Sequence, residues 1–364
     1  MATVGQLLEA LEEIAPPGLA LGDDPIGLQL GTVDSSVHRC AVALDPTLSA
    51  VEFAIRADCQ ALITHHALIY SGLKSLAGES AQVRAIRAAM QANLAVITAH
   101  TNWDAARGGV NDTLCDLLGL TKVVDFGEAS TTRDYKLVTF VPAQHRDEVL
   151  DALSAVGCGR IGNYDRCAFL SEGRGTYEPK AGAQPFSGEV GERSVVAEER
   201  IEMVVPGGVK SAAVRALMKA HPYDEPAFDL YPLANPGFGI GRIGVLPEPM
   251  AVEDFVTMVS DHLDAVVRVF GHAEQLLTVG VIGGSGGFGW REARDRGCEA
   301  LVTGEVRHHD AVEAAESGFL LIEAGHFATE NPAMAVLAAR MQERLPDTEF
   351  VHFDPPPGSS GRHA

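Results

Sequence analysis

The chain has 364 residues, more than one ordinary hydrophobic core organises, so we expect two domains, one of them inserted in the other. Its composition, with 46% hydrophobic and 21% charged residues, is that of a globular protein. The formal net charge of -21 argues against duplex nucleic acid or anionic membrane as a partner of the whole surface, because such binding depends on Lys and Arg patches.

The six cysteines are scattered without a C-x-x-C pair, which indicates reduced and mostly buried thiols. The first residues, Met1 to Gln6, form neither a basic nor an apolar leader segment, and no run of about eighteen apolar residues occurs in the sequence. We therefore expect a cytoplasmic protein that does not bind membranes.

The first third of the sequence alternates between strand and helix patterns. Apolar runs predict strands, and apolar positions repeating with the period of a helix predict helices. The predicted elements are a helix at 3–14, a strand at 40–44, a helix at 47–58 with Leu48, Val51 and Ile55 inward, strands at 61–64 and 94–99, and helices at 81–92 and 110–118. This order implies a parallel sheet covered by helices on both faces.

The middle of the sequence, from about Asp134 to Leu233, has a different rhythm. Its predicted elements are strands at 136–141, 167–171, 200–205 and 227–231, with helices at 146–156 and 209–220. Their βαββαβ order is that of the ferredoxin-like arrangement. The polar segment at 173–192 is predicted to be a long exposed hairpin or loop.

The last third returns to the α/β rhythm. Its predicted elements are strands at 276–282, 300–303 and 319–323, and helices at 290–296, 309–316 and 332–344. We therefore expect one split α/β domain made of two βαβ-type halves, residues 1–130 and 236–353, with an inserted ferredoxin-like α+β domain at 131–235. The tail at 354–364 has little apolar content and is predicted to be disordered.

Metal-competent side chains follow three of the predicted strands directly. They are His65 and His66 after the strand at 61–64, Asp104 after that at 94–99, and His326 and Glu330 after that at 319–323. Because the carboxyl ends of strands in an open α/β sheet share one edge, these side chains are expected to meet in one cluster. Imidazole with carboxylate suits Zn, Mn, Fe or Ni better than Mg or Ca.

Each of these residues also has a plainer interpretation. Neighbouring side chains on a strand face opposite ways, so His65 and His66 share a cavity only if the backbone turns there or if each binds its own ion; otherwise one is a core and one a surface histidine. Asp45 is either an acceptor behind the cluster or the cap of the next helix, and we favour the cap. Because Asn331 and Pro332 are typical of a helix start, we expect His326 and Glu330 on the loop entering that helix.

The segment Gly283 to Gly289 is rich in glycine and lies between a predicted strand and a predicted helix. It matches G-x-G-x-x-G, with Glu305 about twenty residues further on, as in the dinucleotide-binding fingerprint. Against this use, the motif lies in the second half of a split domain. A plainer use is a nest of backbone N–H groups for an anion such as a substrate phosphate.

Six motifs occur in order along nearly the whole chain. They are Thr64-His65-His66, His100-Thr101-Asn102-Trp103-Asp104, Gly108-Gly109-Val110-Asn111-Asp112, His221-Pro222-Tyr223-Asp224-Glu225-Pro226, Thr303-Gly304-Glu305 and Gly325-His326-Phe327-Ala328-Thr329-Glu330. Together they resemble the family named for Ngg-one-interacting factor three, whose bacterial members are labelled type-two homologues of GTP cyclohydrolase I. The resemblance implies a two-metal site, a toroidal homohexamer and an inserted domain.

Carried over by position, the resemblance implies a set of ligands for two divalent ions per chain. These ligands are His65, His66, Asp104, His326 and Glu330. The implied activity is that of a metal-dependent hydrolase acting on C–N bonds of a small-molecule substrate, such as a purine nucleotide or related cyclic amide, with Glu305 or His309 transferring protons. The alternative is a metal-handling or regulatory scaffold without catalysis, whose insert senses a small molecule or a partner.

Overall fold

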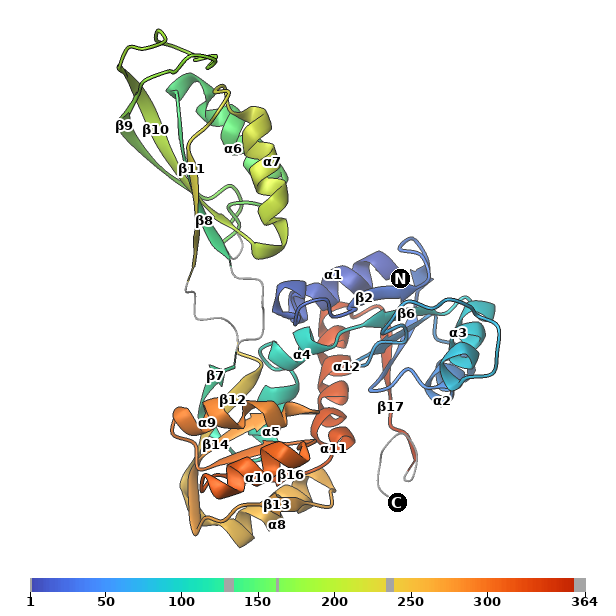
Figure 1. Cartoon of the computed structure of the whole chain (residues 1–364). Helices are drawn as coiled ribbons and strands as arrows, with labels where there is room; N and C mark the ends of the chain where they lie inside the picture. Colours follow the sequence, from blue (N-terminus) through green and yellow to red (C-terminus); the bar gives the residue numbers. More distant parts are fainter. Residues whose placement is uncertain (1, 128–133, 162–163, 234–238, 357–364) are drawn as a thin grey trace. The chain divides into compact units, whose positions relative to one another are not determined.

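The computed structural model describes residues 2–127, 134–161, 164–233 and 239–356, and the chain divides into two compact units. Unit 1 comprises Met1–Ser130 with Phe238–Ala364, and unit 2 comprises Thr131–Gly237. Both are mixed α/β structures, and together they contain several sheets (Figure 1). Every helix in the described part of the chain is too short or too polar to cross a membrane.

The first sheet of unit 1 has the strand order β17-β4-β5-β6-β2. Its strands are β2 (Gly27–Leu30), β4 (Arg39–Ala43), β5 (Ala61–Thr64), β6 (Ala95–Thr98) and β17 (Glu349–Phe353). β2 runs antiparallel to β6, and the other neighbours are parallel. All residues of β5 and β6 are buried, as expected of parallel strands covered on both faces.

Helices cover both faces of this sheet. They are α1 (Val4–Ile14) and α12 (Pro332–Arg344) on one face, and α2 (Leu48–Arg56) and α3 (Ala81–Gln91) on the other. The alternation along β4 shows the two layers, because Val42 joins the core under α12 whereas Ala41 and Ala43 join the core under α2. The prediction that Ile55 points inward is wrong. The buried face of α2 is formed by Ala50, Val51 and Ala54, and Ile55 is exposed.

The second sheet of unit 1 has the strand order β13-β16-β15-β14-β12-β7. Its strands are β7 (Thr121–Phe126), β12 (Gly241–Ala251), β13 (Arg268–Phe270), β14 (Gln275–Ile282), β15 (Ala300–Thr303) and β16 (Leu320–Glu323). Only β14, β15 and β16 are parallel to one another. The helices packed on it are α5 (Val110–Leu117), α8 (Val252–Leu263), α9 (Trp290–Asp295) and α10 (His308–Glu316).

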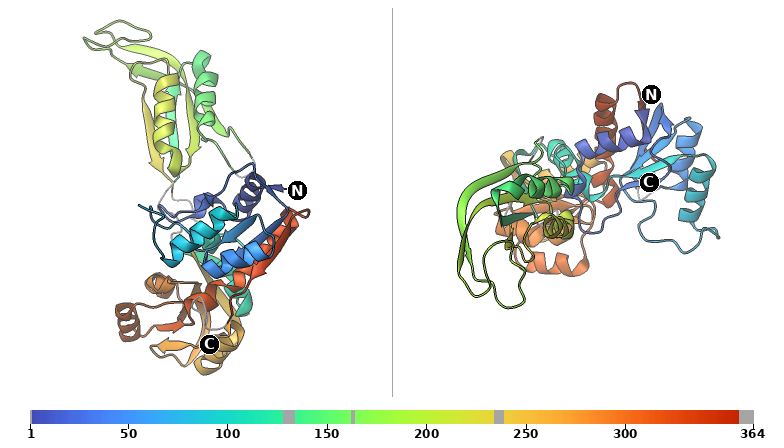
Figure 2. Two further views of the ribbon diagram at one scale, coloured as in Figure 1. Left: turned by 90° about the vertical axis from the view of Figure 1, so that its right-hand side faces the viewer. Right: turned by 90° about the horizontal axis from the view of Figure 1, so that it is seen from above.

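The two sheets correct the expectation of a single parallel sheet, and each one takes strands from both ends of the sequence. β17 from the last segment pairs with β4, so a red strand lies beside a blue one in Figure 2. Likewise, β7 from the first segment of the chain pairs with β12 from the last segment. A short pair, β1 (Ala2–Thr3) with β3 (Ser36–Val37), lies beside α1.

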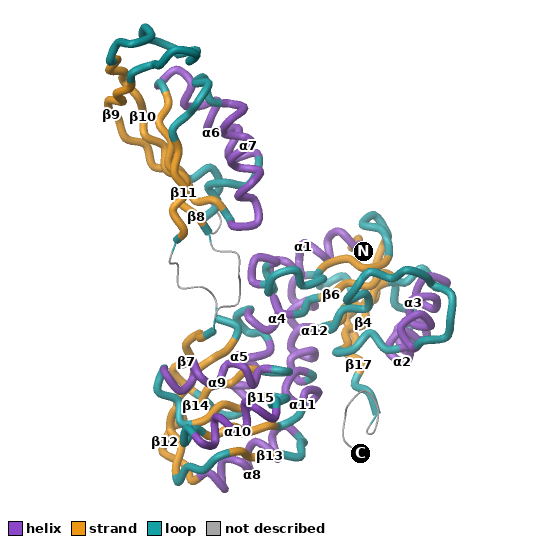
Figure 3. Tube along the Cα trace, viewed as in Figure 1, coloured by secondary structure: helices purple, strands orange, loops and turns teal. Residues whose placement is uncertain are grey.

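Unit 2 is a four-stranded antiparallel sheet with the order β11-β8-β10-β9. Its elements are β8 (Tyr135–Val141), α6 (Arg146–Ala155), β9 (Ala168–Tyr177), β10 (Ser194–Val205), α7 (Lys210–Ala220) and β11 (Phe228–Pro232). Both helices lie on one face of the sheet (Figure 3). β9 and β10 extend further than predicted, so the segment joining them is 178–193 rather than 173–192.

The end of the described chain is ordered through Pro356, contrary to the predicted disorder from residue 354. Asn331 Nδ2 donates a hydrogen bond to Asp354 Oδ1 at 3.2 Å, and Pro355 is buried. The remainder of the predicted tail, 357–364, lies outside the described residues.

Candidate metal centre

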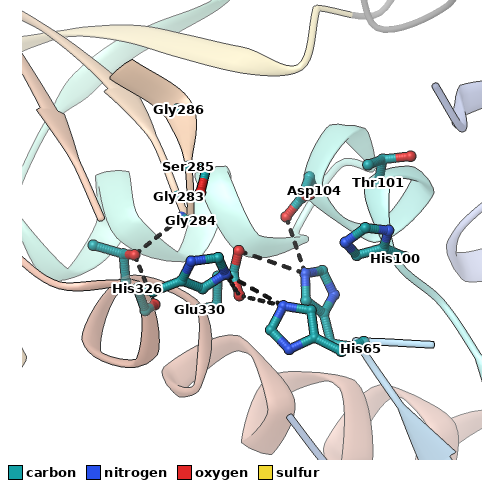
Figure 4. A network of polar contacts seen from close by, with 12 residues as sticks. His65, His100, Thr101, Asp104, Gly283, Gly284, Ser285, Gly286, His326 and Glu330 are labelled. Carbon is teal, nitrogen blue, oxygen red and sulfur yellow. Dashed lines mark hydrogen bonds and ion pairs between the residues drawn. The ribbon is translucent and has the colours of Figure 1, made fainter. Parts of the chain in front are cut away.

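The predicted ligands converge in unit 1 between the carboxyl ends of strands from both sheets (Figure 4). His65 and His66 follow β5 of the first sheet. Asp104 lies on the short helix α4 (Thr101–Ala105), which follows β6, and His326 and Glu330 lie on α11 (His326–Glu330), which follows β16 of the second sheet. The side chains therefore meet after strand ends, as expected, but the strands belong to two different sheets.

His65 and His66 both reach the cluster because the backbone turns at this point. The amides of His65 and His66 donate to the carbonyls of Ala43 and Leu44 at 3.2 and 3.0 Å, and Thr64 Oγ1 donates to the carbonyl of His66 at 2.8 Å. The two rings lie 5.1 Å apart with their planes tilted by 55°. Alternation along a strand therefore does not apply after Thr64.

Four imidazoles at the cluster have the same orientation. In each, Nδ1 contacts an oxygen behind the ring: His65 with the carbonyl of Ala99 at 3.0 Å, His66 with Asp45 Oδ1 at 2.7 Å, His100 with Asp24 Oδ1 at 2.7 Å, and His326 with Glu305 Oε1 at 3.1 Å. Because these oxygens accept hydrogen bonds, Nδ1 carries a proton and Nε2 is the nitrogen left to bind a metal ion once it has lost its own proton. This arrangement fixes the tautomer that metal-binding histidines use.

Glu330 lies between the imidazoles, and its side chain is 5% exposed. Its Oε2 lies 3.1 Å from Nε2 of both His66 and His326, and its Oε1 lies 3.7 Å from Nε2 of His65. Asp104 Oδ1 lies 3.5 Å from the same His65 nitrogen. The Glu330 carboxylate thus faces His65 through Oε1, and it faces His66 and His326 through Oε2.

The side chains fit a bound cation. Three combinations, His65-Asp104-Glu330, His66-His326-Glu330 and His65-His66-His100, each bring ligand atoms within 4.8 Å of one another. Among the described residues, His65 Nε2 and Asp104 Oδ1 are buried without a hydrogen-bond partner. Such atoms are costly to bury unless something binds them, and a divalent transition metal binds both imidazole nitrogen and carboxylate oxygen.

The charges of the cluster are coupled. Burial works against a charged His66, but hydrogen bonds with Asp45 and Glu330 outweigh it and raise the pKa of His66 to about 10. Burial raises the pKa of Asp104 to about 6. Burial also disfavours a charged Glu330, yet the neighbouring imidazoles of His65, His326 and His66 hold the pKa of Glu330 well below its ordinary value. Binding of a cation therefore displaces protons from the imidazoles.

Gly284 allows the close approach of the glycine-rich segment to Glu330. It adopts φ +59°, a conformation that favours glycine, and a Cβ added there would collide with Glu330 Oε1. The nearby Gly304 is equally constrained, since a Cβ would lie 2.7 Å from the Gly284 carbonyl oxygen and 2.8 Å from His326 Cα. These glycines serve the packing around the cluster.

The glycine-rich segment is held to its neighbours through four of its backbone amides. Its amides already donate to protein acceptors: Gly283 to Asn111 Oδ1 at 2.7 Å, Gly284 to Thr329 Oγ1 at 3.1 Å, Gly286 to Thr303 Oγ1 at 3.0 Å and Gly287 to the Glu305 carbonyl at 3.3 Å. Glu305, the acidic residue of the fingerprint, accepts from Ser285 Oγ at 2.6 Å. These four amides are therefore not available to a dinucleotide or to an anion nest.

The geometry corrects two further predictions and adds one candidate ligand. Asp45 is not the cap of α2, whose cap is Thr47; it is the acceptor behind His66. His326 and Glu330 lie on the helical turn α11 and not on a loop, because α11 continues directly into α12. Sequence reasoning also missed His100 as a candidate ligand, although its position two residues past β6 matches that of His66 past β5.

The two predicted proton-transfer residues differ in their placement. Glu305 lies at the site, where Ser285 and His326 lower the pKa of its carboxyl group although burial opposes them. The structure does not bring His309 to the cluster: its exposed ring on α10 contacts the ring of His308, with centroids 5.6 Å apart.

A cavity of about 760 Å³ opens beside the cluster, within the size range of small-molecule sites. His66, His326, Asp45 and Glu305 are among its lining residues. Arg268 also lines it and is paired with Glu323, while its side chain stays 67% exposed. The cluster is therefore accessible to a small molecule from this side.

Comparison with known proteins agrees with this arrangement of motifs. A relative from Halalkalibacterium halodurans named "GTP cyclohydrolase 1 type 2 homolog" is 38% identical over 360 residues, covering 96% of this chain and 97% of the relative. A Bacillus subtilis protein with the same name is 37% identical over 327 residues, covering 89% and 88%. The crystal structure of a Bacillus cereus protein related to NIF3 superposes with a TM-score of 0.69 at 33% identity and covers 97% of each chain.

The family profile of Duf34/NIF3 (NGG1p interacting factor 3) matches residues 2–356, nearly the full length of the sequence. The resemblance predicted from the six motifs is confirmed by this match and by the relatives. The chain therefore belongs to the Duf34/NIF3 family.

Proposed function

We propose that the cluster holds two divalent transition-metal ions and that the protein is a metal-dependent hydrolase. The observation that carries the proposal is the position of Glu330, whose Oε1 faces His65 and whose Oε2 faces His66 and His326. Asp104 adds a second carboxylate on the His65 side. Each side then offers imidazole nitrogen and carboxylate oxygen, with positions left over for water or substrate.

The ions would supply Lewis acidity toward an electrophilic carbon and would lower the pKa of a water molecule. The protein residues orient the ligands, since Asp45, Asp24, Glu305 and the Ala99 carbonyl each hold one imidazole by Nδ1. Such acceptors behind the ligands fix ring orientation and raise ligand basicity. The cavity beside His66 and His326 gives a substrate access to the same face.

The substrate class that we propose is a purine nucleotide or a related cyclic amide, opened by hydrolysis of a C–N bond. Its support is the name of the relatives, "GTP cyclohydrolase 1 type 2 homolog". Glu305 is the residue of this chain that we propose as proton acceptor, because its carboxylate lines the cavity and its lowered pKa keeps it charged.

The alternative function is a metal-handling or regulatory scaffold that turns nothing over. One observation favours it: the carboxylates lining the cavity are already engaged, Asp45 with His66, Glu305 with Ser285 and His326, and Glu323 with Arg268. A dedicated general base is better served by a carboxylate that is free to exchange its proton. Turnover measurements distinguish the two functions.

The metal content is tested first. Protein purified without chelator is expected to contain about two transition-metal ions per chain. The double variant His65→Ala, Asp104→Ala is expected to lose most of this metal, whereas His262→Ala, an exposed histidine on α8, is the matched control and should keep it. Unchanged metal in the double variant would refute the metal site.

Activity is tested next, with metal-loaded protein and a panel of GTP, other nucleotides and cyclic amides. Metal-dependent product formation that Glu330→Gln abolishes supports the hydrolase. Full metal content without turnover across the panel supports the scaffold.

We also propose a homohexamer on the family resemblance alone, and light scattering that gives a monomer at micromolar concentration would contradict it.

A further inference from the structure

Unit 2 contains a cavity of about 1030 Å³ that is separate from the metal centre. It lies on the face of the sheet opposite to α6 and α7, because Glu198 and Arg200 line it whereas their neighbours Ile201 and Met203 belong to the core under the helices. The segment 178–193, which joins β9 to β10, contributes to its walls. This volume is at the upper end of the range of small-molecule sites.

Gly175 in β9 makes room for the carboxylate of Glu198. Gly173 is paired with Glu198 across the two strands, and Gly175 is paired with Val196, so both glycines lie on the cavity side. A Cβ added to Gly175 would collide with Glu198 Oε2. Because Gly175 has no side chain, the carboxylate of Glu198 lies close to β9.

Tyr223, which donates a hydrogen bond to the carboxylate of Glu198, belongs to a cluster of aromatic rings. Tyr223 has its ring centroid 5.8 Å from that of Phe186 and 6.3 Å from that of Tyr177. Hydrogen bonds fix the loop that carries Phe186: Tyr177 Oη donates to the Ser187 carbonyl at 2.6 Å, and the amide of Gln184 donates to Asp224 Oδ2 at 3.0 Å. The cavity is thus held by specific contacts and is more than a gap beneath a loop.

His221 fixes Tyr223 without adding positive charge. Its Nε2 donates to the Phe140 carbonyl at 2.9 Å, and its Nδ1 accepts from the amide of Tyr223 at 3.1 Å. An imidazole that donates through one nitrogen and accepts through the other is neutral. Burial also lowers the pKa of His221, which keeps it neutral near pH 7.

The buried carboxylate has unused capacity. Glu198 is 9% exposed, and the hydrogen bond that we find for it among the described residues comes from Tyr223 Oη to Oε1 at 2.7 Å. The nearby Arg200 is engaged elsewhere, because its Nε donates to Glu202 at 2.8 Å and its guanidinium lies over the Phe140 ring. A carboxylate accepts several hydrogen bonds, and a buried one without a cationic partner is unfavourable.

We propose that this cavity binds an organic cation with a ring or other apolar body, through Glu198 and the rings of Tyr223 and Phe186. An ammonium or guanidinium group would donate to Glu198, and its positive charge would also be attracted to the aromatic faces. The lining supports the sign of the charge, with five acidic side chains against three basic ones. The inference does not depend on the function proposed for the metal centre.

The test uses the full-length protein and phenethylammonium as the probe, a ring that carries a primary ammonium group. 2-Phenylethanol is the neutral probe and 3-phenylpropionate the anionic one. Binding is measured by isothermal titration and by ligand-observed NMR, with and without a metal chelator. We expect saturable binding of the cation alone, unaffected by the chelator.

Variants locate the binding. Glu198→Gln keeps the shape and an acceptor for Tyr223 but removes the charge, and we expect it to weaken the cation about tenfold or more. Glu192→Gln removes one charge from the same loop outside the cavity lining and should bind as the wild type does. Phe186→Ala, at a side chain 46% exposed, should also weaken binding without disturbing the fold.

Equal binding of the three probes, no saturable binding of the cation, or unchanged affinity in both Glu198→Gln and Phe186→Ala would overturn the proposal.

Discussion

Substitution of Gly284 by alanine is expected to damage the metal centre while leaving the fold intact. The backbone at Gly284 has φ +59°, and its amide donates to Thr329. An alanine Cβ would collide with Glu330 Oε1 and lie 3.2 Å from His326 Nε2. The three atoms nearest to the added Cβ all belong to side chains, and the closest is the carboxylate end of Glu330, so Glu330 is the group that moves.

The Gly284→Ala substitution has two separate effects, one on the free energy of folding and one on metal affinity. Holding alanine in the left-handed region costs about 1–2 kcal/mol of folding free energy, whatever its surroundings. Displacement of Glu330 lowers metal affinity in addition, by about 10- to 100-fold, the range found when groups that position metal ligands are altered. Stability without metal therefore falls by the first amount alone, and stability with metal falls more, because the stabilisation by bound metal increases with the logarithm of its affinity.

Gly119→Ala separates the two parts. Gly119 has φ +64°, nearly the same conformation, but an added Cβ would meet nothing within 4 Å. Metal affinity is measured by competition with a chromogenic chelator, and stability by thermal unfolding with and without metal. Gly284→Ala should lose affinity and Gly119→Ala should not. Equal affinity in the two variants would refute the assignment of Glu330 as a central ligand.

Substitutions at three other positions have defined outcomes. Asp45→Ala should lower metal affinity about 10- to 100-fold, because it removes the acceptor behind His66. Asp45→Asn should lower the affinity less, since an amide oxygen still accepts from His66 Nδ1. Equal losses of affinity for the two variants in a chelator competition would contradict the role of Asp45 as this acceptor. Arg242→Met should destabilise the protein by about 3–5 kcal/mol in denaturant titrations, since Arg242 is fully buried and paired with Asp112; a loss near zero would show that the pair is dispensable. Because burial lowers the pKa of His221 in the folded state, the free energy of unfolding should fall as the pH drops below the ordinary histidine value of 6.5. The His221→Gln variant should lack this contribution, which is measured by denaturant unfolding at pH 5 and pH 7.

The sequence was informative where a strand is apolar on both faces. Ala61–Thr64 and Leu320–Glu323 are continuous apolar runs, so the ends of these two strands were placed correctly along the chain. β7 and β12 were missed for the opposite reason: Thr121–Phe126 is largely exposed, and Gly241–Ala251 contains two prolines. Without these strands, the second sheet could not be distinguished from the first.

The partners behind the ligands could not be predicted, because they depend on tertiary contacts over long separations. Asp24 lies in a loop far before His100 in sequence, and its role follows only from the position of that loop over α4. Asp45 directly precedes a helix start, and local propensity therefore favoured capping, but the turn after β5 brings His66 to it. The role of His65, His66, Asp104, His326 and Glu330 as ligands stays a prediction until metal is measured.

The exchange of strands between the two sheets of unit 1 has a consequence for biosynthesis. The first sheet is complete only when β17 (Glu349–Phe353) pairs with β4, and α11, which carries His326 and Glu330, also comes late in the chain. Residues 134–233 form a unit with its own core and can fold while the ribosome is still adding the rest. The nascent N-terminal segment must wait for partners roughly three hundred residues away, so its closure is a slow, long-range step. A ribosome stalled before residue 320 would therefore expose the apolar strands around His65 to chaperones and proteases.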